Sequence, residues 1–204
     1  MKFIETIEEL RQIYGEPGER AVKKQLNYID AHSARFLSLS PFALIASQDL
    51  DGNGDVTPKG DAPGFVRMLD KHTLALPDRP GNNRLDSWQN LLANPAVGML
   101  FMIPGMDETL RINGTAKLTA DPELCEELGM NGRPARAVMV VKVHEVYMHC
   151  AKAFIRSKLW HPTSWPDRGE MPTLGEILHD QVASHEAAES IDQTLEQAYR
   201  DRLW

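Results

Sequence analysis

The sequence has little cysteine, no long apolar run and no excess of positive charge. Cys125 and Cys150 are the only cysteines among 204 residues and form no CxxC pair, which disfavours a disulfide framework. No stretch reaches the ~18 apolar residues of a membrane span. The first twenty residues carry acids throughout and have no apolar core of a signal peptide. We therefore expect a cytoplasmic protein that does not insert into a membrane.

Several function classes lack their signature. The net charge of −7 excludes a global basic footprint for nucleic acid. No GxGxxG follows a predicted strand, and neither GxxxxGK[ST] nor GxSxG occurs. HxH, HExxH and CxxC spacings are also missing, so we expect no metal site. With 42% hydrophobic and 25% charged residues, the chain has the composition of an ordinary soluble globular protein.

Helices are predicted at both ends of the chain. Apolar residues recur at helical spacing from Ile4 to Tyr14, and the segment 15–18, GEPG, stops that helix. A second run passes through Val22, Leu26 and Ile29, and a third covers 31–39. After a proline-rich loop at 160–172, the pattern predicts helices over 173–182 and 185–202.

The middle of the chain predicts six strands. They cover 41–49, 64–69, 72–77, 96–105, 109–118 and 136–150. The segment 96–105 is apolar on both faces and predicts a central strand. In 109–118 the residues Leu110, Ile112, Gly114 and Ala116 alternate with polar ones. A short helix at 121–128 has Asp121 as its N-cap and Pro122 at its first position.

These elements predict a single β-rich α+β domain over 1–204. Its core is a six-stranded antiparallel split β-barrel over 41–160, because hairpins join most of the strands. A helical extension occupies 1–40, and a loop with C-terminal helices occupies 161–204.

The segment 77–95, PDRPGNNRLDSWQNLLANP, places Arg79 and Arg84 around a tight turn before an amphipathic helix. Asn82 or Asn83 is the expected N-cap, and Gly81 permits close approach of the backbone. Backbone N–H groups at a helix start and arginine side chains both favour phosphate. Glycine and asparagine are also common turn formers, so an ordinary solvated surface turn remains the alternative.

Three further groups of basic residues could each bind an anion or have an ordinary structural role. Lys59 and Gly60 are expected between two strands, where the lysine is either a point charge for an anion or a surface residue. Arg111 lies mid-strand on the polar face, as an anion ligand or a cross-strand partner. Residues 148–160 combine His149, Lys152, Arg156 and Trp160, which suits a phosphate and a flat ring or simply the basic end of a helix. His144 and His149, five residues apart on one strand, are predicted to point to opposite faces.

The order of five segments resembles that of the pyridoxamine 5′-phosphate oxidase-like flavoproteins. These segments are SPFALIAS, TPKGDAPGFV, TLALPDRPGNNRLDSWQNLLANPAVGMLFMIPG, ETLRINGTAKL and HCAKAFIRSKLW. The resemblance covers about 40–165. It implies an FMN-binding split barrel and a homodimer with two FMN sites at the subunit interface.

Carried over position by position, the resemblance implies a set of FMN-binding residues. Arg84 is the expected phosphate ligand. The expected set is Lys59, Gly60, Asp61, Pro77, Asp78, Arg79, Asn83, Arg84, Thr109, Arg111, Lys152, Arg156, Ser157 and Trp160. The last four are expected to close the site from the partner subunit, and no catalytic residue is assigned.

The sequence also departs from the authentic pyridoxamine phosphate oxidases. No substrate motif of the Arg-x-His type follows residue 165, so vitamin B6 specificity is not expected. The resemblance implies an oxidoreductase that passes hydride or electrons between a small molecule and an acceptor such as O₂ or a nicotinamide cofactor. Two alternatives stay open: a flavin carrier or sensor without turnover, and a haem-binding protein with His144, His149 or His161 as ligand.

Overall fold

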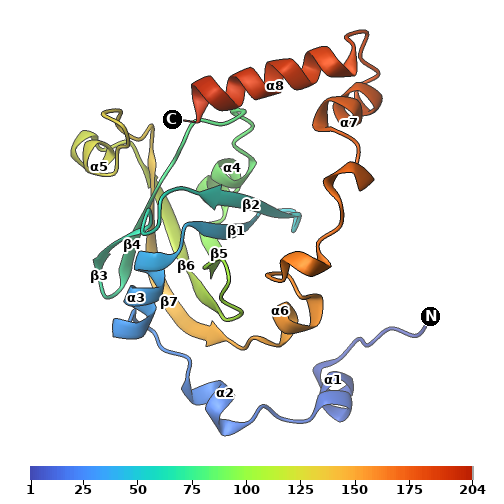
Figure 1. The fold of residues 1–204 in the computed structure, drawn as a ribbon. Helices are drawn as coiled ribbons and strands as arrows, with labels where there is room; N and C mark the ends of the chain where they lie inside the picture. The colour runs from blue at the N-terminus through green and yellow to red at the C-terminus, as the bar shows by residue number, and fades with distance from the viewer. Residues whose placement is uncertain (204) are drawn as a thin grey trace.

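A computed structural model describes residues 1–203 and shows one antiparallel sheet with helices around it (Figure 1). The strands are β1 (Phe42–Gln48), β2 (Gly54–Gly60), β3 (Arg67–Asp70), β4 (Thr73–Pro77), β5 (Ala96–Met102), β6 (Thr109–Thr119) and β7 (Val138–His149). The helices are α1 (Ile7–Tyr14), α2 (Glu19–Lys23), α3 (Ala31–Leu39), α4 (Asp86–Ala93), α5 (Pro122–Glu127), α6 (Lys152–Ser157), α7 (Leu174–Gln181) and α8 (Ala188–Arg202). Two 3₁₀ turns, Pro162–Ser164 and Arg168–Glu170, lie in the predicted loop.

The sheet has seven strands in the order β2-β1-β5-β6-β7-β4-β3, so the predicted count of six was wrong. The additional strand is β2, which pairs with β1 from Phe42–Gly60 to Gln48–Gly54. It was missed because Pro58 and the short polar residues around it give no apolar run. Proline is tolerated there because β2 is an edge strand. Among residues 1–203 no pairing joins β2 to β3, so the hydrogen-bonded sheet stays open.

The main core lies against one face of this sheet. Ile112 and Leu110 of β6, Phe101 of β5 and Leu74 of β4 are fully buried there, together with Phe36 of α3. The predicted inward set of β6 is confirmed, since Leu110, Ile112, Gly114 and Ala116 are all buried. A smaller cluster joins Ala75 and Val138 to Cys125 and Leu128 under α5. The core therefore holds β4 and α4 on either side of the segment 78–85.

Local signals explain most helix boundaries. Thr6 and Glu9 form a capping box at the start of α1, and Gly15 ends that helix. Asp121 caps α5 with Pro122 at its first position, as predicted. The predicted helix through Val22, Leu26 and Ile29 was wrong beyond Lys23, because Leu26 instead forms a bridge with Val146 of β7.

Two parts of the chain stand away from the sheet. Figure 1 shows two arms: α1 and α2 lie below the sheet, and α6 to α8 run up one side and cross above it until the end of α8 meets the turn 79–83. No residue of α1 is buried. None of the helices in residues 1–203 combines the length and apolar character that a bilayer crossing requires.

Candidate functional site

The segment 78–85 joins β4 to α4 and has an unusual backbone. Asp78 N–H donates to the carbonyl of Ala137 on the strand side, 2.9 Å away. Asn83 and Leu85 both have φ of 60°, in the left-handed region. A bulky residue such as leucine rarely adopts that conformation. Backbone strain of this kind is concentrated at functional sites, which marks this turn for attention.

Helix α4 begins without a side-chain cap. Its N-cap is Leu85, not Asn82 or Asn83, so the predicted cap was wrong. Asn82 instead stabilises the turn that precedes the helix, because its Oδ1 accepts a hydrogen bond from the Arg84 N–H at 3.1 Å. The first N–H groups of α4 therefore have no side-chain acceptor. An uncapped helix start is favourable for an anion.

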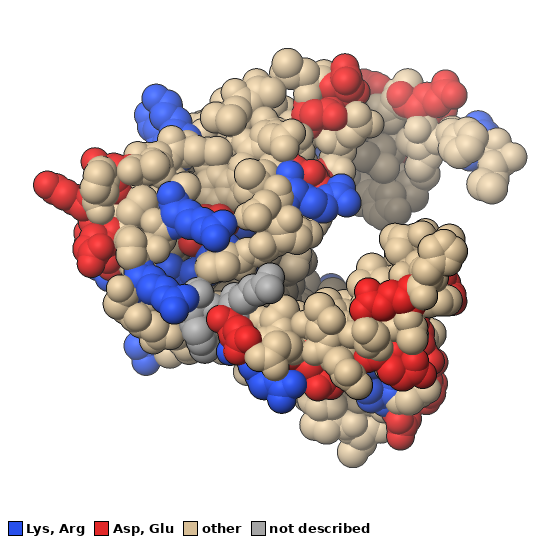
Figure 2. All heavy atoms as spheres, turned by 90° about the horizontal axis from the view of Figure 1, so that it is seen from above, with Lys and Arg blue, Asp and Glu red and all other residues tan. Residues whose placement is uncertain are grey.

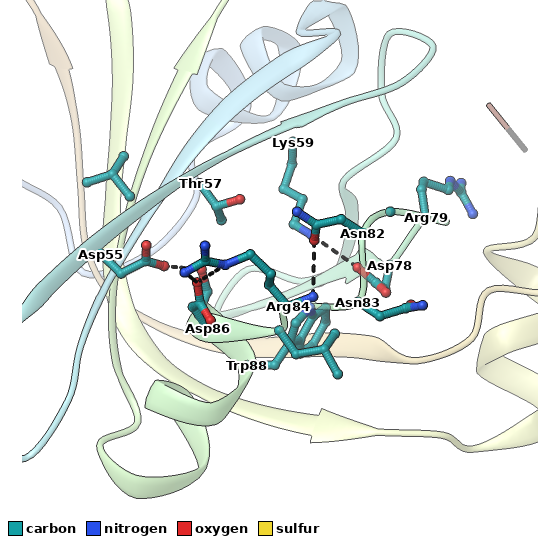
Figure 3. A pocket seen from close by; sticks show the side chains of 14 residues that line it. Asp55, Thr57, Lys59, Asp78, Arg79, Asn82, Asn83, Arg84, Asp86 and Trp88 are labelled. Atoms are coloured by element: carbon teal, nitrogen blue, oxygen red, sulfur yellow. Dashed lines mark hydrogen bonds and ion pairs between the residues drawn. The ribbon is translucent and has the colours of Figure 1, made fainter. Parts of the chain in front are cut away.

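A pocket of about 260 Å³ opens at this helix start (Figure 3). Its walls come from the edge strand β2, the turn and the first turn of α4. The lining residues are Asp55, Val56, Thr57, Lys59, Asp78, Arg79, Gly81, Asn82, Asn83, Arg84, Leu85, Asp86, Ser87 and Trp88. We call it the turn pocket. It is polar and smaller than the ~300–1000 Å³ of typical ligand pockets, which suits a phosphate and its nearest atoms rather than a whole flavin.

The three cations of the turn pocket each face a carboxylate. Lys59 Nζ lies 3.0 Å from Asp78 Oδ1. Arg84 holds Asp86 Oδ2 through Nε at 2.9 Å and Nη2 at 2.8 Å. Asp55 also lines the pocket and accepts a short hydrogen bond from the Ser87 hydroxyl. An anion that binds Arg84 must therefore displace the Asp86 carboxylate.

Arg84 can be redirected most easily. Its side chain is 75% exposed, and an exposed ion pair is worth only ~0–1 kcal/mol. Arg79, by contrast, is 20% exposed and lies 2.6 Å from Asp61, whose side chain is 4% exposed. Arg79 also donates to the carbonyl of Leu128 at 2.9 Å. Breaking a buried pair costs about 3–5 kcal/mol, so Arg79 holds the turn in place.

Lys59 combines a charge with an aromatic neighbour. The structure places Lys59 and Gly60 inside β2, not between strands as the sequence predicted. Lys59 Nζ lies 5.5 Å from the ring centroid of Trp88 on α4. Its ammonium has three donor hydrogens and uses one on Asp78. Lys59 can therefore keep Asp78 and still donate to a ligand.

The structure brings together part of the predicted set. Lys59, Asp78, Arg79, Asn83 and Arg84 line the turn pocket. Gly60 and Asp61 line an adjoining cleft, and Pro77 is the buried last residue of β4. The sequence analysis missed the acids Asp55 and Asp86, which nothing in the pattern of residue types singled out.

Thr109 and Arg111 lie elsewhere, on β6, and do not line the turn pocket. Thr109 is buried and pairs with His149 of β7, while Arg111 Nη1 donates to the Tyr147 hydroxyl at 2.8 Å. Lys24 Nζ lies 5.1 Å from the same tyrosine ring centroid. The sheet thus carries a second cationic group on one face.

His149 lies within this second group. Its Nε2 is buried and has no hydrogen-bond partner among the described residues. Burial lowers the pKa of His149 below its ordinary value, and the charges of Arg111 and Lys24 lower it further. The imidazole is therefore held in its neutral form.

The predicted opposite orientation of His144 and His149 was wrong. The register shifts between Asn113 and Gly114 of β6, because Asn113 pairs with Glu145 but Gly114 pairs with Val143. His144 is the extra residue of this bulge, and a bulge breaks the two-residue alternation. His144 Nε2 consequently lies 3.4 Å from Thr115 Oγ1, on the face that also carries His149.

The four remaining predicted residues lie in and after α6. Lys152, Arg156 and Ser157 are exposed. Trp160 stacks on Phe154 at 5.8 Å between centroids and donates from Nε1 to the carbonyl of Met106 at 2.8 Å. None of them lines the turn pocket. Among residues 1–203 no group of three His, Cys, Asp or Glu could hold a metal ion.

Comparison with known proteins gives a family for most of the chain. A family model described as Pyridoxamine 5′-phosphate oxidase matches residues 29–150. That stretch contains the whole sheet, α4 and the turn pocket. No match was found among curated proteins.

Solved structures of low sequence identity are also similar. HupZ from Group A Streptococcus has 17% identity and a TM-score of 0.48, over 58% of this chain and 91% of that chain. A putative pyridoxamine 5′-phosphate oxidase from Lactobacillus delbrueckii has 21% identity and a TM-score of 0.48, over 61% and 98%. An FMN-binding protein from Syntrophomonas wolfei has 12% identity and a TM-score of 0.44, over 71% and 97%.

Proposed function

The chain belongs to the pyridoxamine 5′-phosphate oxidase family, and we propose that it binds FMN and acts as an oxidoreductase on a small organic molecule. The flavin, when bound, supplies the hydride or electron chemistry, and the protein supplies binding, orientation and electrostatics. The proposed acceptor is O₂ or a nicotinamide cofactor.

The observation that carries this proposal is the uncapped start of α4. Its free N–H groups, the exposed Arg84 and Lys59 all border one small polar pocket (Figure 3). A phosphate there would accept backbone hydrogen bonds and exchange with Asp86 for the Arg84 guanidinium. Asp78 would keep Lys59 oriented, and Asp61 would keep Arg79 in the wall of the turn.

The turn pocket alone is too small for the ring system, so we propose that a second subunit completes the site. Lys152, Arg156, Ser157 and Trp160 are the residues proposed to reach it from the partner. Thr109 and Arg111 are proposed to face the flavin from the sheet. We further propose that the open sheet, with α4 packed beside β1 and β2, corresponds to the family's split barrel in a homodimer.

A comparison of two flavins tests the proposal directly. FMN and riboflavin are titrated into flavin-free protein while flavin fluorescence is followed. FMN is expected to bind at least about tenfold more tightly, because charge-assisted hydrogen bonds contribute roughly 1.5–3 kcal/mol each. Equal affinity for the two would show that the turn pocket does not hold the phosphate. Bleaching of bound FMN by NADH or NADPH then separates an oxidoreductase from a carrier without turnover.

A further inference from the structure

A second and larger cleft adjoins the turn pocket. Both are lined by Arg79 and by 81–83 of the turn. The other walls of the cleft come from 60–62 at the end of β2, from the loop 130–136, which precedes β7, and from the end of α8. Its volume is about 950 Å³, near the upper end of the ~300–1000 Å³ range of small-molecule sites. We call it the α8 cleft.

The walls of the α8 cleft expose more apolar than polar surface, and the five charged residues that line it are Asp61, Arg79, Arg133, Arg136 and Asp201. Pro80, Met130, Ala198 and Tyr199 supply apolar surface, and the Tyr199 side chain is exposed. Predominantly apolar walls that carry some polar groups are typical of sites for organic ligands. The turn pocket differs, since ten of its fourteen lining residues are polar or charged.

Arg133 and Arg136 are exposed residues of the loop 130–136 that line the α8 cleft. Both also line a narrower pocket of about 180 Å³ behind Pro80 and Pro134, so they border two connected hollows. Figure 2, which looks down on α8, shows Lys and Arg side chains gathered around the end of that helix. The sequence analysis missed both arginines, although the segment GRPAR places them on either side of a proline.

The charge of Arg136 is available to a ligand. Its Nη1 donates to Asn83 Oδ1 at 3.2 Å, which is a neutral amide. The third arginine of the cleft, Arg79, is neutralised by Asp61 at 2.6 Å. An incoming carboxylate or phosphate would therefore meet Arg136 without displacing a carboxylate from it, unlike an anion that binds Arg84 in the turn pocket.

We propose that the α8 cleft binds a small organic anion with a planar apolar part. Arg136 holds its carboxylate or phosphate, because a guanidinium presents a planar fork of donors to such groups. Tyr199 and Met130 cover the apolar part. The α8 cleft shares Arg79 and 81–83 with the turn pocket, but Arg136, Met130 and Tyr199 line only the α8 cleft of the two.

Phenyl phosphate is the probe for the test, measured by isothermal titration calorimetry on the purified protein. Inorganic phosphate lacks the ring and benzyl alcohol lacks the charge. Each is expected to bind at least about tenfold more weakly than phenyl phosphate. Arg136→Gln is expected to weaken phenyl phosphate by about tenfold, and Arg20→Gln on α2 is the matched control with unchanged binding.

Two further variants separate this site from the flavin site. Arg84→Ala is expected to leave phenyl phosphate binding unchanged while it weakens FMN. Tyr199→Ala, on an exposed position of α8, is expected to weaken phenyl phosphate but not inorganic phosphate. If Arg136→Gln does not fold, Tyr199→Ala still tests whether the α8 cleft binds phenyl phosphate. Unchanged phenyl phosphate binding in Tyr199→Ala and in Arg136→Gln would overturn the proposal, as would a loss only in Arg84→Ala.

Discussion

At the residue scale, the properties of the turn pocket depend on which of its ion pairs can open. The exposed pair between Arg84 and Asp86 can exchange with solvent, whereas the pair between Arg79 and Asp61 is nearly closed off from water. The sequence predicted both arginines and Asp61 as site residues but did not predict Asp86. An arginine near a glycine-rich turn indicates an anion, but its partner depends on side-chain packing that no local spacing specifies.

Arg84→Ala is expected to weaken FMN about tenfold to a hundredfold. The reason is the loss of one charge-assisted interaction of roughly 1.5–3 kcal/mol, at about 1.4 kcal/mol for each tenfold step. Riboflavin, without a phosphate, should bind the variant and the unaltered protein equally. Flavin-fluorescence titration measures both. Asp86→Asn is the informative companion, because it frees Arg84 and should tighten FMN. If riboflavin weakens as much as FMN in Arg84→Ala, the arginine has a structural role only.

Leu85 offers a second residue-scale prediction. Its φ of 60° costs a non-glycine residue about 1 kcal/mol or more. Leu85→Gly removes that strain and loses little packing, since the side chain is about half exposed. We expect the melting temperature to rise and FMN to bind more weakly, because the turn becomes less fixed. A lower melting temperature would show that the leucine side chain contributes more than its backbone costs.

At the element scale, the sequence predicted six of the seven strands and missed the edge strand β2. β5 and β6 have long apolar or alternating runs, while β2 is recognised only by its pairing with β1. The β-bulge at His144 was also not predicted from the sequence pattern, since a register shift depends on the partner strand and not on the residue itself. Sequence therefore predicted the elements better than their edges and irregularities.

The β-bulge between β6 and β7 depends on Gly114, which lies at the register shift. A Cβ built there would overlap the carbonyl oxygen of Lys142 on β7, which is backbone and cannot turn aside. Gly114→Ala is expected to lower the free energy of unfolding by about 1–3 kcal/mol or more. Gly54→Ala at the start of β2 is the matched control, because open space surrounds that position. Urea unfolding measures both, and equal stability of the two variants would contradict the prediction.

The β6–β7 pair also predicts a pH dependence. The pKa of His149 lies below its ordinary value of 6.5, through burial first and then through Arg111 and Lys24. The unfolded chain therefore takes up the proton first as pH falls. The stability from the neutral imidazole is present above pH 6.5 and is lost as pH falls through the folded pKa. Tyr147 is the other titratable group in contact with the ring.

Unfolding curves at about pH 7.5 and about pH 5 test this. The unaltered protein should lose more stability between them than His149→Gln does. Asp30, Asp49 and Asp70 also have pKa values lowered by hydrogen bonds, but from 3.8 downward, so their contribution falls outside this window. An identical pH dependence of both proteins would show that His149 does not titrate differently on folding.

At the scale of the whole molecule, the helical arms present apolar side chains that the chain itself does not cover. Ile7, Ile13 and Tyr14 of α1 are 72%, 62% and 75% exposed, and Ile155 of α6 is 57% exposed. Figure 2 shows open space between the arms and part of the body. The periodicity of α1 predicted a helix correctly, but a periodic face does not specify what packs on it. A second copy is the proposed occupant.

A composite dimer makes a prediction about mixed variants. Suppose that Arg84 of one subunit and Trp160 of the other build one site. A mixed dimer has one Arg84→Ala subunit and one Trp160→Ala subunit. One of its two sites then carries both substitutions, and the other site carries neither. Unfolding and refolding an equal mixture should give half mixed dimers in a two-fold assembly, so about a quarter of all sites regain unaltered FMN affinity. Fluorescence titration of the mixture detects them as a separate tight phase. Sedimentation at twice the 22.9 kDa chain mass confirms that the mixture is dimeric. A dimer that shows no tight phase would mean that each subunit builds its flavin site alone, and a monomer saturated with FMN would exclude the shared site altogether.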